Sequence, residues 1–82
     1  MLNQNEVHKL LDKLCVSLGF CLSPDHIERL VSDPPSEVLD FTDEVFRADG
    51  LDPRVADRHL YRQVRDMVAL AFIQSEQEID IT

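Results

Sequence analysis

The sequence is short of the residues that build turn-rich β folds. It has no Trp, one Tyr and two Gly among its 82 residues. No segment alternates apolar and polar side chains as a half-buried strand would. No segment approaches the roughly 20 consecutive apolar residues that cross a bilayer as a helix. These shortages argue against a turn-rich β fold and a membrane-spanning protein, and they favour one small helical domain covering residues 1–82.

The sequence motifs of common enzyme classes are also missing. There is no GxSxG, HExxH, P-loop or GxGxxG pattern. The three histidines, His8, His26 and His59, fall on polar helix positions that are far apart in the sequence. A zinc site built on Cys21 and His26 would need two more ligands at a suitable spacing. We therefore expect no enzyme activity, no metal and no cofactor.

Basic residues are half as numerous as acidic ones, 8 against 16, which gives a formal net charge of −8 at pH 7. Such a charge repels nucleic acids and anionic membranes and favours a basic protein partner. The alternative is that the acidity only keeps a small domain soluble. We expect a protein partner and neither a membrane nor a nucleic-acid partner.

The two cysteines, Cys15 and Cys21, do not form a CxxC motif. We interpret them as buried free thiols of a reducing compartment. The N-terminal segment MLNQNEVHK is polar and does not resemble a secretion signal. The sequence therefore predicts a cytoplasmic protein.

Four helices are predicted, at residues 3–18, 24–32, 34–48 and 53–75. The first has apolar residues at steps of three and four, which is the period of an amphipathic helix: Val7, Leu10, Leu11, Leu14, Cys15 and Leu18. Asn3 with Glu6 resembles a capping box, and Gly19 suits the position after the last turn.

Proline marks the start of each later helix, at Ser23-Pro24, Asp33-Pro34-Pro35 and Asp52-Pro53, because Pro is well tolerated at the first helical position. Gly50 is expected to end the third helix. The tail, residues 76–82, lacks a helical stripe and is expected to fray. The fold prediction is an all-α, small, orthogonal or irregular four-helix bundle with the long C-terminal helix central.

The third predicted helix carries an acidic face, which consists of Glu37, Asp40, Asp43 and Glu44. A local negative field of this kind can steer a basic partner and take the place of phosphates. Immunity proteins that silence nuclease toxins share this small size, acidity and helical class. By that analogy we predict a non-enzymatic protein-binding module, and specifically an acidic inhibitor or immunity-type protein.

The fourth predicted helix carries a basic stripe of Arg54, Arg58, Arg62 and Arg65. These arginines could contact phosphates, but no aromatic residues interleave them as a stacking platform for bases. We favour internal ion pairing with Glu37, Asp40 or Glu44 of the neighbouring helix.

The end of the fourth helix, from Met67 to Ile73, is apolar on more than one side. Ala69, Leu70, Phe72 and Ile73 fall off the main stripe. A homodimer through these residues would make the chain a self-associating accessory protein. The alternative is that Leu2, Phe20 and Leu22 cover them within one chain.

Ser36 suggests one more function. Acyl carrier proteins are also small, acidic and four-helical, and they carry phosphopantetheine on a Ser at a helix start. Here Ser36 lies between Pro35 and Glu37, whereas that family has Asp-Ser-Leu or a close variant. The resemblance rests on size and charge, so a carrier modified at Ser36 is the lowest-ranked alternative.

Overall fold

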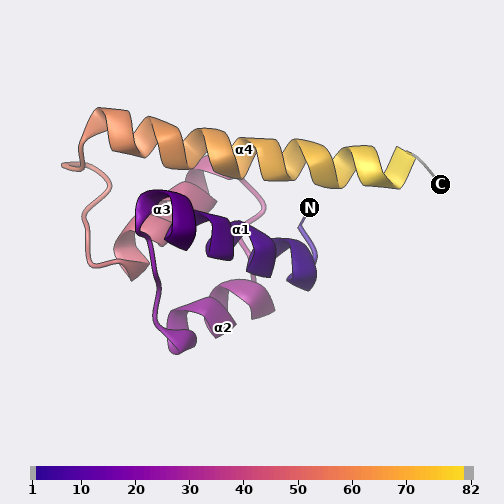
Figure 1. Ribbon diagram of the computed structural model, residues 1–82, viewed down its shortest axis with the longest axis horizontal. Coiled ribbons are helices and arrows are strands. Elements are labelled where there is room, and N and C mark those ends of the chain that lie inside the picture. Colours follow the sequence, from indigo (N-terminus) through magenta and orange to yellow (C-terminus); the bar gives the residue numbers. More distant parts are fainter. Residues whose placement is uncertain (1, 81–82) are drawn as a thin grey trace.

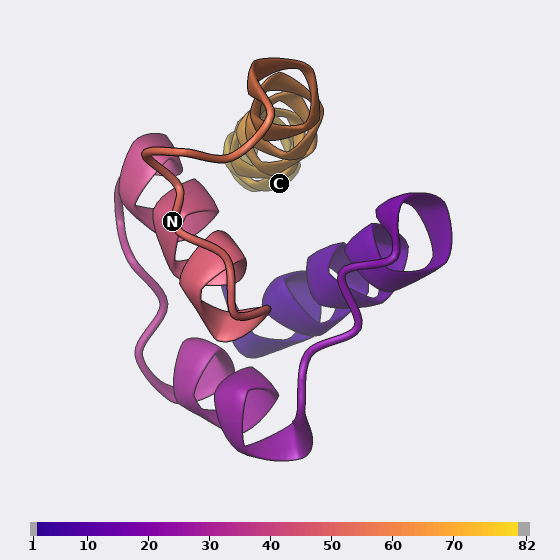
Figure 2. The same cartoon turned by 90° about the vertical axis from the view of Figure 1, so that its left-hand side faces the viewer.

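The computed structural model of the chain describes the backbone of residues 2–80 and the side chains of residues 2–75. It contains the helices α1 (Gln4–Leu18), α2 (Pro24–Ser32), α3 (Val38–Ala48) and α4 (Arg58–Asp80), and residues 2–80 include no strand. The long helix α4 packs on both α1 and α3, while α2 packs on α1 from the side away from α4 (Figures 1 and 2). The predicted all-α four-helix bundle is confirmed.

Helix α1 begins and ends as its sequence predicts. The Asn3 side chain accepts a hydrogen bond from the backbone N–H of Glu6, and the Glu6 carboxylate accepts one from the backbone N–H of Asn3, both at 2.9 Å. At the other end Gly19 has φ of +80°, a conformation that suits glycine because it has no Cβ. The chain then turns back, and Phe20 enters the core as an anchor of the following loop.

The core lies where one face of every helix meets. Its buried members are Leu2, Val7, Leu10, Leu11, Leu14, Phe20, Leu30, Phe41, Val45, Phe46, Val64 and Val68. The apolar stripe of α1 supplies four of them, as its periodicity predicts. Thr42 is also fully buried, and its hydroxyl donates to the backbone carbonyl of Val38 at 2.8 Å, so the core encloses no unpaired hydroxyl at this position.

Helix α3 starts later than predicted, at Val38 instead of residue 34. Pro35 disfavours the helical conformation of the residue before it, so a helix cannot begin comfortably at Pro34. Glu37 takes the extended conformation of an N-cap, with φ of −109° and ψ of 141°. The segment between α2 and α3 is therefore a connection in which Pro34 and Pro35 are half-buried.

Helix α4 also starts later than predicted, at Arg58 instead of residue 53. The Asp52 carboxylate accepts a hydrogen bond from the backbone N–H of Arg54 at 2.9 Å, but this bond closes a turn and does not cap a helix. That N–H and the Arg54 guanidinium hold the pKa of Asp52 below its ordinary value. The helix begins after a second aspartate, Asp57, whose carboxylate accepts from the backbone N–H of His59 at 2.9 Å.

The far end of α4 differs from the prediction as well. The helix continues to Asp80, past the predicted end at about residue 75 and through most of the tail that was expected to fray. The side chains beyond Ser75 and the whole of residues 81 and 82 lie outside the described residues. As a ribbon, α4 projects past the N-terminal end of α1 (Figure 1).

Cys15 and Cys21 form a disulfide, which corrects the prediction of buried free thiols. The reversal of the chain after Gly19 brings the two Cα atoms to 4.3 Å, and a linear periodicity argument does not reveal this proximity. Cys15 is half-buried and Cys21 is exposed. The cysteines therefore no longer support a reducing compartment.

Truncation of Leu14, which is fully buried, should lower the free energy of unfolding by about 3 kcal/mol, because Leu14→Ala leaves a cavity in the core. The matched control is Leu39→Ala, which removes the same atoms from a side chain that is 56% exposed. Urea denaturation followed by circular dichroism measures both. Equal losses for the two variants would contradict the core described above.

Loss of the disulfide should lower the free energy of unfolding by about 2 kcal/mol, because the unfolded chain regains the freedom of the short closed loop. Denaturation midpoints of the oxidised protein, the reduced protein and the Cys15→Ser/Cys21→Ser variant test this. Reductant should leave the variant's midpoint unchanged. An oxidised protein no more stable than the reduced one would refute the expectation.

Candidate functional site

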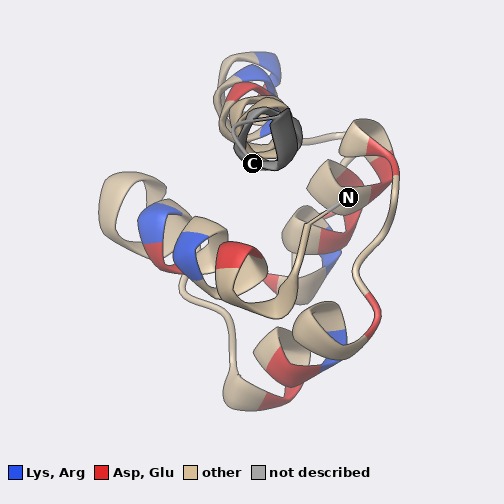
Figure 3. Ribbon diagram, turned by 90° about the vertical axis from the view of Figure 1, so that its right-hand side faces the viewer, with Lys and Arg blue, Asp and Glu red and all other residues tan. Residues whose placement is uncertain are grey.

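The acidic face of α3 is turned away from the core. The buried side of the helix consists of Phe41, Thr42, Val45 and Phe46, and this arrangement directs Glu37 and Asp40 into solvent. Asp43 and Glu44 lie at the two margins and are half-buried. Acidic segments recur along α3 and the connection before it, whereas basic segments gather on the first turns of α4 (Figure 3).

A shallow hollow of about 640 Å³ lies between the α2–α3 connection and α3. Its charged lining consists of Asp33, Asp40, Asp43, Glu44, Arg29 and Arg47. The structure thus brings together three of the four predicted acidic residues, and it adds Asp33 and two arginines that the sequence did not assign to the site. Glu37 stands beside this hollow as the N-cap of α3 and does not line it.

The four predicted carboxylates have different local partners. Glu44 forms an ion pair with Arg47 one turn along the same helix, at 3.0 Å. Asp43 accepts a hydrogen bond from the hydroxyl of Tyr61 in α4, at 2.7 Å. Glu37 and Asp40 form no ion pair or side-chain hydrogen bond with any described residue. The two exposed carboxylates are therefore available to a partner.

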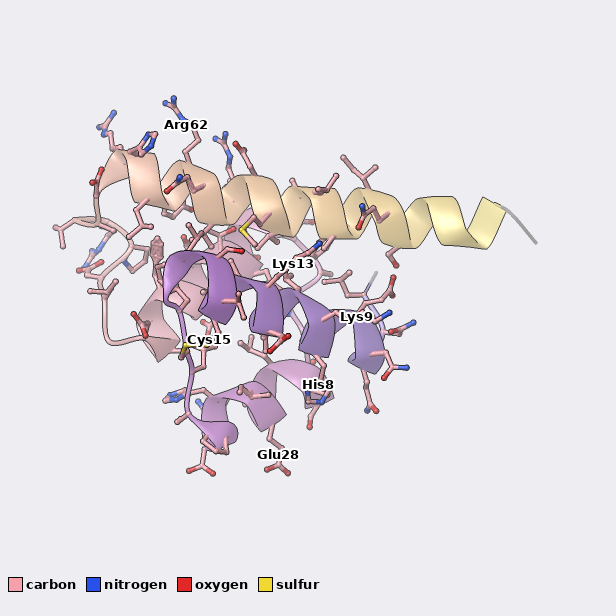
Figure 4. All side chains as sticks on the ribbon, in the orientation of Figure 1. His8, Lys9, Lys13, Cys15, Glu28 and Arg62 are labelled. Atoms are coloured by element: carbon pink, nitrogen blue, oxygen red, sulfur yellow. A yellow bond between two sulfur atoms is a disulfide. The ribbon has the colours of Figure 1, made fainter. Side chains whose placement is uncertain are left out.

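The basic stripe does not pair with α3, in contrast to the predicted internal ion pairing. Arg54 pairs with Asp52 and Arg65 with Asp66, each close in sequence. Arg58 and Arg62 form no ion pair with a described residue. Arg62 points away from the bundle (Figure 4). The contact between α3 and α4 includes two aromatic pairs, Phe46 with Tyr61 and Phe41 with Phe72.

The contact between the two helices includes Tyr61, which the sequence analysis did not assign to a site. The Tyr61 ring packs edge-on against Phe46, with centroids 5.3 Å apart, while its hydroxyl reaches Asp43. Burial raises the pKa of Tyr61 to about 12, and the Asp43 carboxylate adds to this increase. The sequence clue to this hydrogen bond was a single tyrosine next to the apolar stripe of the helix.

The residues of the predicted dimer surface differ in their burial. Phe72 is half-buried and packs edge-on against Phe41, with centroids 6.2 Å apart, so it belongs to the core contact with α3. Ala69 is half-buried, but Leu70 is 51% and Ile73 50% exposed. The alternative cover was Leu2, Phe20 and Leu22. Leu2 and Phe20 are buried in the core and Leu22 packs against it, while Leu70 and Ile73 stay about half exposed.

The remaining predicted positions do not assemble into a site. Ser36 lies exposed in the connection before α3 and lines the hollow with the carboxylates. Among the described residues, no group of three or more His, Cys, Asp or Glu side chains could hold a metal ion. In the same part of the chain, no helix combines the length and apolar character needed to cross a membrane.

No protein-family model, curated protein or solved structure matches the chain. The functional argument therefore depends on the geometry and charge of the chain itself.

The titration of Tyr61, which is the only tyrosine in the chain, should be visible by absorbance at alkaline pH. We expect a midpoint near 12 in the folded protein, against 10.0 for the ordinary group. The pKa of Tyr61 is higher in the folded than in the unfolded protein. The contribution of its neutral hydroxyl to the free energy of unfolding is therefore complete below the unfolded-state pKa and is lost as pH rises through the folded-state pKa.

The control is Tyr61→Phe, which keeps the ring and removes the hydroxyl. Stability measured by denaturation across that alkaline interval should fall less steeply in this variant than in the native protein. A native midpoint at the ordinary value would contradict the buried contact with Asp43.

Proposed function

We propose that the chain is a non-enzymatic protein-binding module, and that the acidic surface of α3 binds a basic surface of another protein. This acidic surface consists of Glu37, Asp40, Asp43 and Glu44 together with Asp33. The observation that supports the proposal is that Glu37 and Asp40 are exposed and form no ion pair within the described residues. The molecule's own arginines leave these charges uncompensated.

The hollow gives the acidic surface a shape as well as a charge. Arg29 and Arg47 lie among its carboxylates, and Arg47 forms an exposed ion pair with Glu44. A lysine or arginine of a partner can enter between Asp33 and Asp40, which have no ion pair with a described residue. Guanidinium groups bind carboxylates in a forked, two-bond geometry, so arginine is the best-suited partner residue.

The overall charge of −8 supports fast association with a basic protein. Complementary fields raise the rate of encounter, and this effect weakens when salt screens the charges. An inhibitor or immunity-type role is the specific form that we propose, since an acidic helix can occupy a surface that otherwise binds phosphates. That form rests on an analogy of size, charge and helical class.

The disulfide is relevant to the compartment in which the protein would bind such a partner. The predicted cytoplasmic location relied on free thiols, whereas Cys15 and Cys21 are bonded. Disulfides persist in oxidising compartments and are rare in the cytosol. We therefore propose an oxidising environment for the interaction instead of the cytoplasm.

Charge reversal tests the acidic surface. In Glu37→Lys/Asp40→Lys, two unpaired carboxylates become cations, and the rate of association with a basic partner should fall about tenfold at low salt. The partner is first captured by affinity purification and identified by mass spectrometry. Association of the purified pair is then measured by surface plasmon resonance over a range of salt concentrations.

The matched control is Asp25→Lys/Glu28→Lys. These residues are exposed on α2 and make no ion pair with a described residue, and Asp25 occupies a first helical turn just as Asp40 does. The control thus has the same change in net charge and a similar effect on a helix terminus. If both double variants slow association equally, the α3 surface has no specific role and the proposal fails.

A further inference from the structure

The basic stripe lines a hollow of its own at the start of α4, with a volume of about 250 Å³. Among the described residues, the charged side chains that line this hollow are four arginines and no carboxylate: Arg54, Arg58, Arg62 and Arg65. Figure 3 shows these first turns of α4 as basic. The acidic surface of α3 contributes no residue to the lining. The hollow is therefore a second charged surface, opposite in sign to the acidic one.

Half of the positive charge in the hollow has no counter-ion in contact. Two of the four arginines pair with aspartates next to them in the sequence. Arg58 and Arg62 form neither an ion pair nor a side-chain hydrogen bond with a described residue. A nearby carboxylate, that of Asp57, accepts from the backbone N–H of His59 and does not line the hollow. Two guanidinium groups are thus left to an external anion.

The spacing of these two arginines suits one compact anion. Arg58 and Arg62 are one helical turn apart, about 6 Å along the axis, and lie on the same side of α4. Like charges at this spacing repel each other, and an anion bound between them offsets that repulsion. A guanidinium group donates two parallel hydrogen bonds in a planar fork, so two such groups can share the oxygens of one tetrahedral phosphate. The arrangement therefore favours an anion with several oxygens around one centre.

The rest of the lining is less polar. It consists of Pro53, Ala56 and Tyr61, which are all half-buried. The Tyr61 hydroxyl donates to Asp43 of α3, so the guanidinium groups are the side-chain donors left for a ligand in the hollow. Ion contacts are stronger beside apolar groups than in bulk water. A small apolar substituent on the anion can also pack on these side chains.

We propose that this hollow binds a phosphomonoester group. Such a group carries about −1.5 to −2 charges at pH 7, which matches the two guanidinium groups without a counter-ion. A carboxylate or a phosphodiester supplies one charge and leaves the other guanidinium unmatched. An extended polyanion such as a nucleic acid is also repelled by the net charge of −8, whereas a single group meets mainly the local positive charge.

The first test compares two ligands of the same shape. Phenyl phosphate and phenyl sulfate both place a tetrahedral group on a ring, but the sulfate carries a single charge. Isothermal titration calorimetry at constant ionic strength should give a Kd of about 1 mM for phenyl phosphate. Phenyl sulfate should bind about fivefold more weakly. Equal affinities for the two ligands, or no saturation by phenyl phosphate below about 10 mM, would overturn the proposal.

The second test removes the two unpaired arginines. Arg58→Gln/Arg62→Gln should raise the Kd for phenyl phosphate about tenfold, because the charge-assisted hydrogen bonds are lost. Since neither side chain has a partner within the described residues, the denaturation midpoint of the ligand-free variant should not fall below that of the native protein. Arg58→Lys/Arg62→Lys keeps the charge without the forks, and its Kd should lie between the other two. Native affinity in either variant would contradict the forked contacts.

The matched control is Lys9→Gln/Lys13→Gln. These exposed cations are also four residues apart on one helix and form no ion pair with a described residue. The control therefore makes the same change in net charge outside the hollow. It should leave the Kd for phenyl phosphate close to the native value. An equal loss of affinity in the control and in the arginine variant would show a general charge effect, and the proposal would fail.

A third test distinguishes the sources of the phosphomonoester, which can be a small molecule or a phosphorylated side chain of a protein. A phosphotyrosine peptide with neutral flanking residues is compared with phenyl phosphate. Tighter binding of the peptide identifies a protein source, and equal binding identifies a small molecule. A short DNA strand without terminal phosphates should not bind. If that strand binds as tightly as phenyl phosphate, the hollow recognises phosphodiesters and the proposal is wrong. None of these measurements depends on partner binding through α3.

Discussion

The packing of aromatic rings between α3 and α4 is the constraint on which the other arrangements depend. Phe46 contacts both Phe20 from the α1–α2 loop and Tyr61 from α4, with centroid distances of 5.0 Å and 5.3 Å. Phe41 meets Phe72 nearer the other end of the same contact. Rings of this size allow few alternative packings, so they set the register in which α4 crosses α3. The acidic face is directed outward because the opposite face of α3 is fully used by this contact.

Much of the fold follows from local signals in the sequence. The apolar period of α1, its capping box and Gly19 each correspond to an observed structure, because each depends on residues only a few positions apart. The late start of α3 was missed because Pro35 disfavours the helical conformation of Pro34. The late start of α4 was missed because two cap signals compete. Asp52-Pro53 and Asp57 can each cap a helix, and the choice between them depends on the distance that the chain must cover after α3, which is a tertiary property.

The sequence predicted which side chains share a helix face, but it did not predict which side chains contact one another. Helical periodicity grouped the carboxylates on the side of α3 opposite its apolar face, but it could not show that Asp43 bonds to Tyr61 or that Arg58 and Arg62 form no ion pair with α3. The Cys15–Cys21 disulfide was missed for a similar reason, since the reversal after Gly19 creates the proximity. In each case the missing information was the angle between two segments, which a one-dimensional pattern does not contain.

The hydrogen bond between Tyr61 and Asp43 has a practical consequence. Because the chain has no Trp, its near-ultraviolet emission comes from the single tyrosine, Tyr61. The hydroxyl of Tyr61 is hydrogen-bonded to Asp43 of the acidic surface. A neighbouring carboxylate accepts the phenolic proton in the excited state and dims that emission. A cation arriving at Asp43 would relieve the quenching, so the native chain carries an intrinsic, label-free fluorescent reporter at the surface where a ligand would arrive.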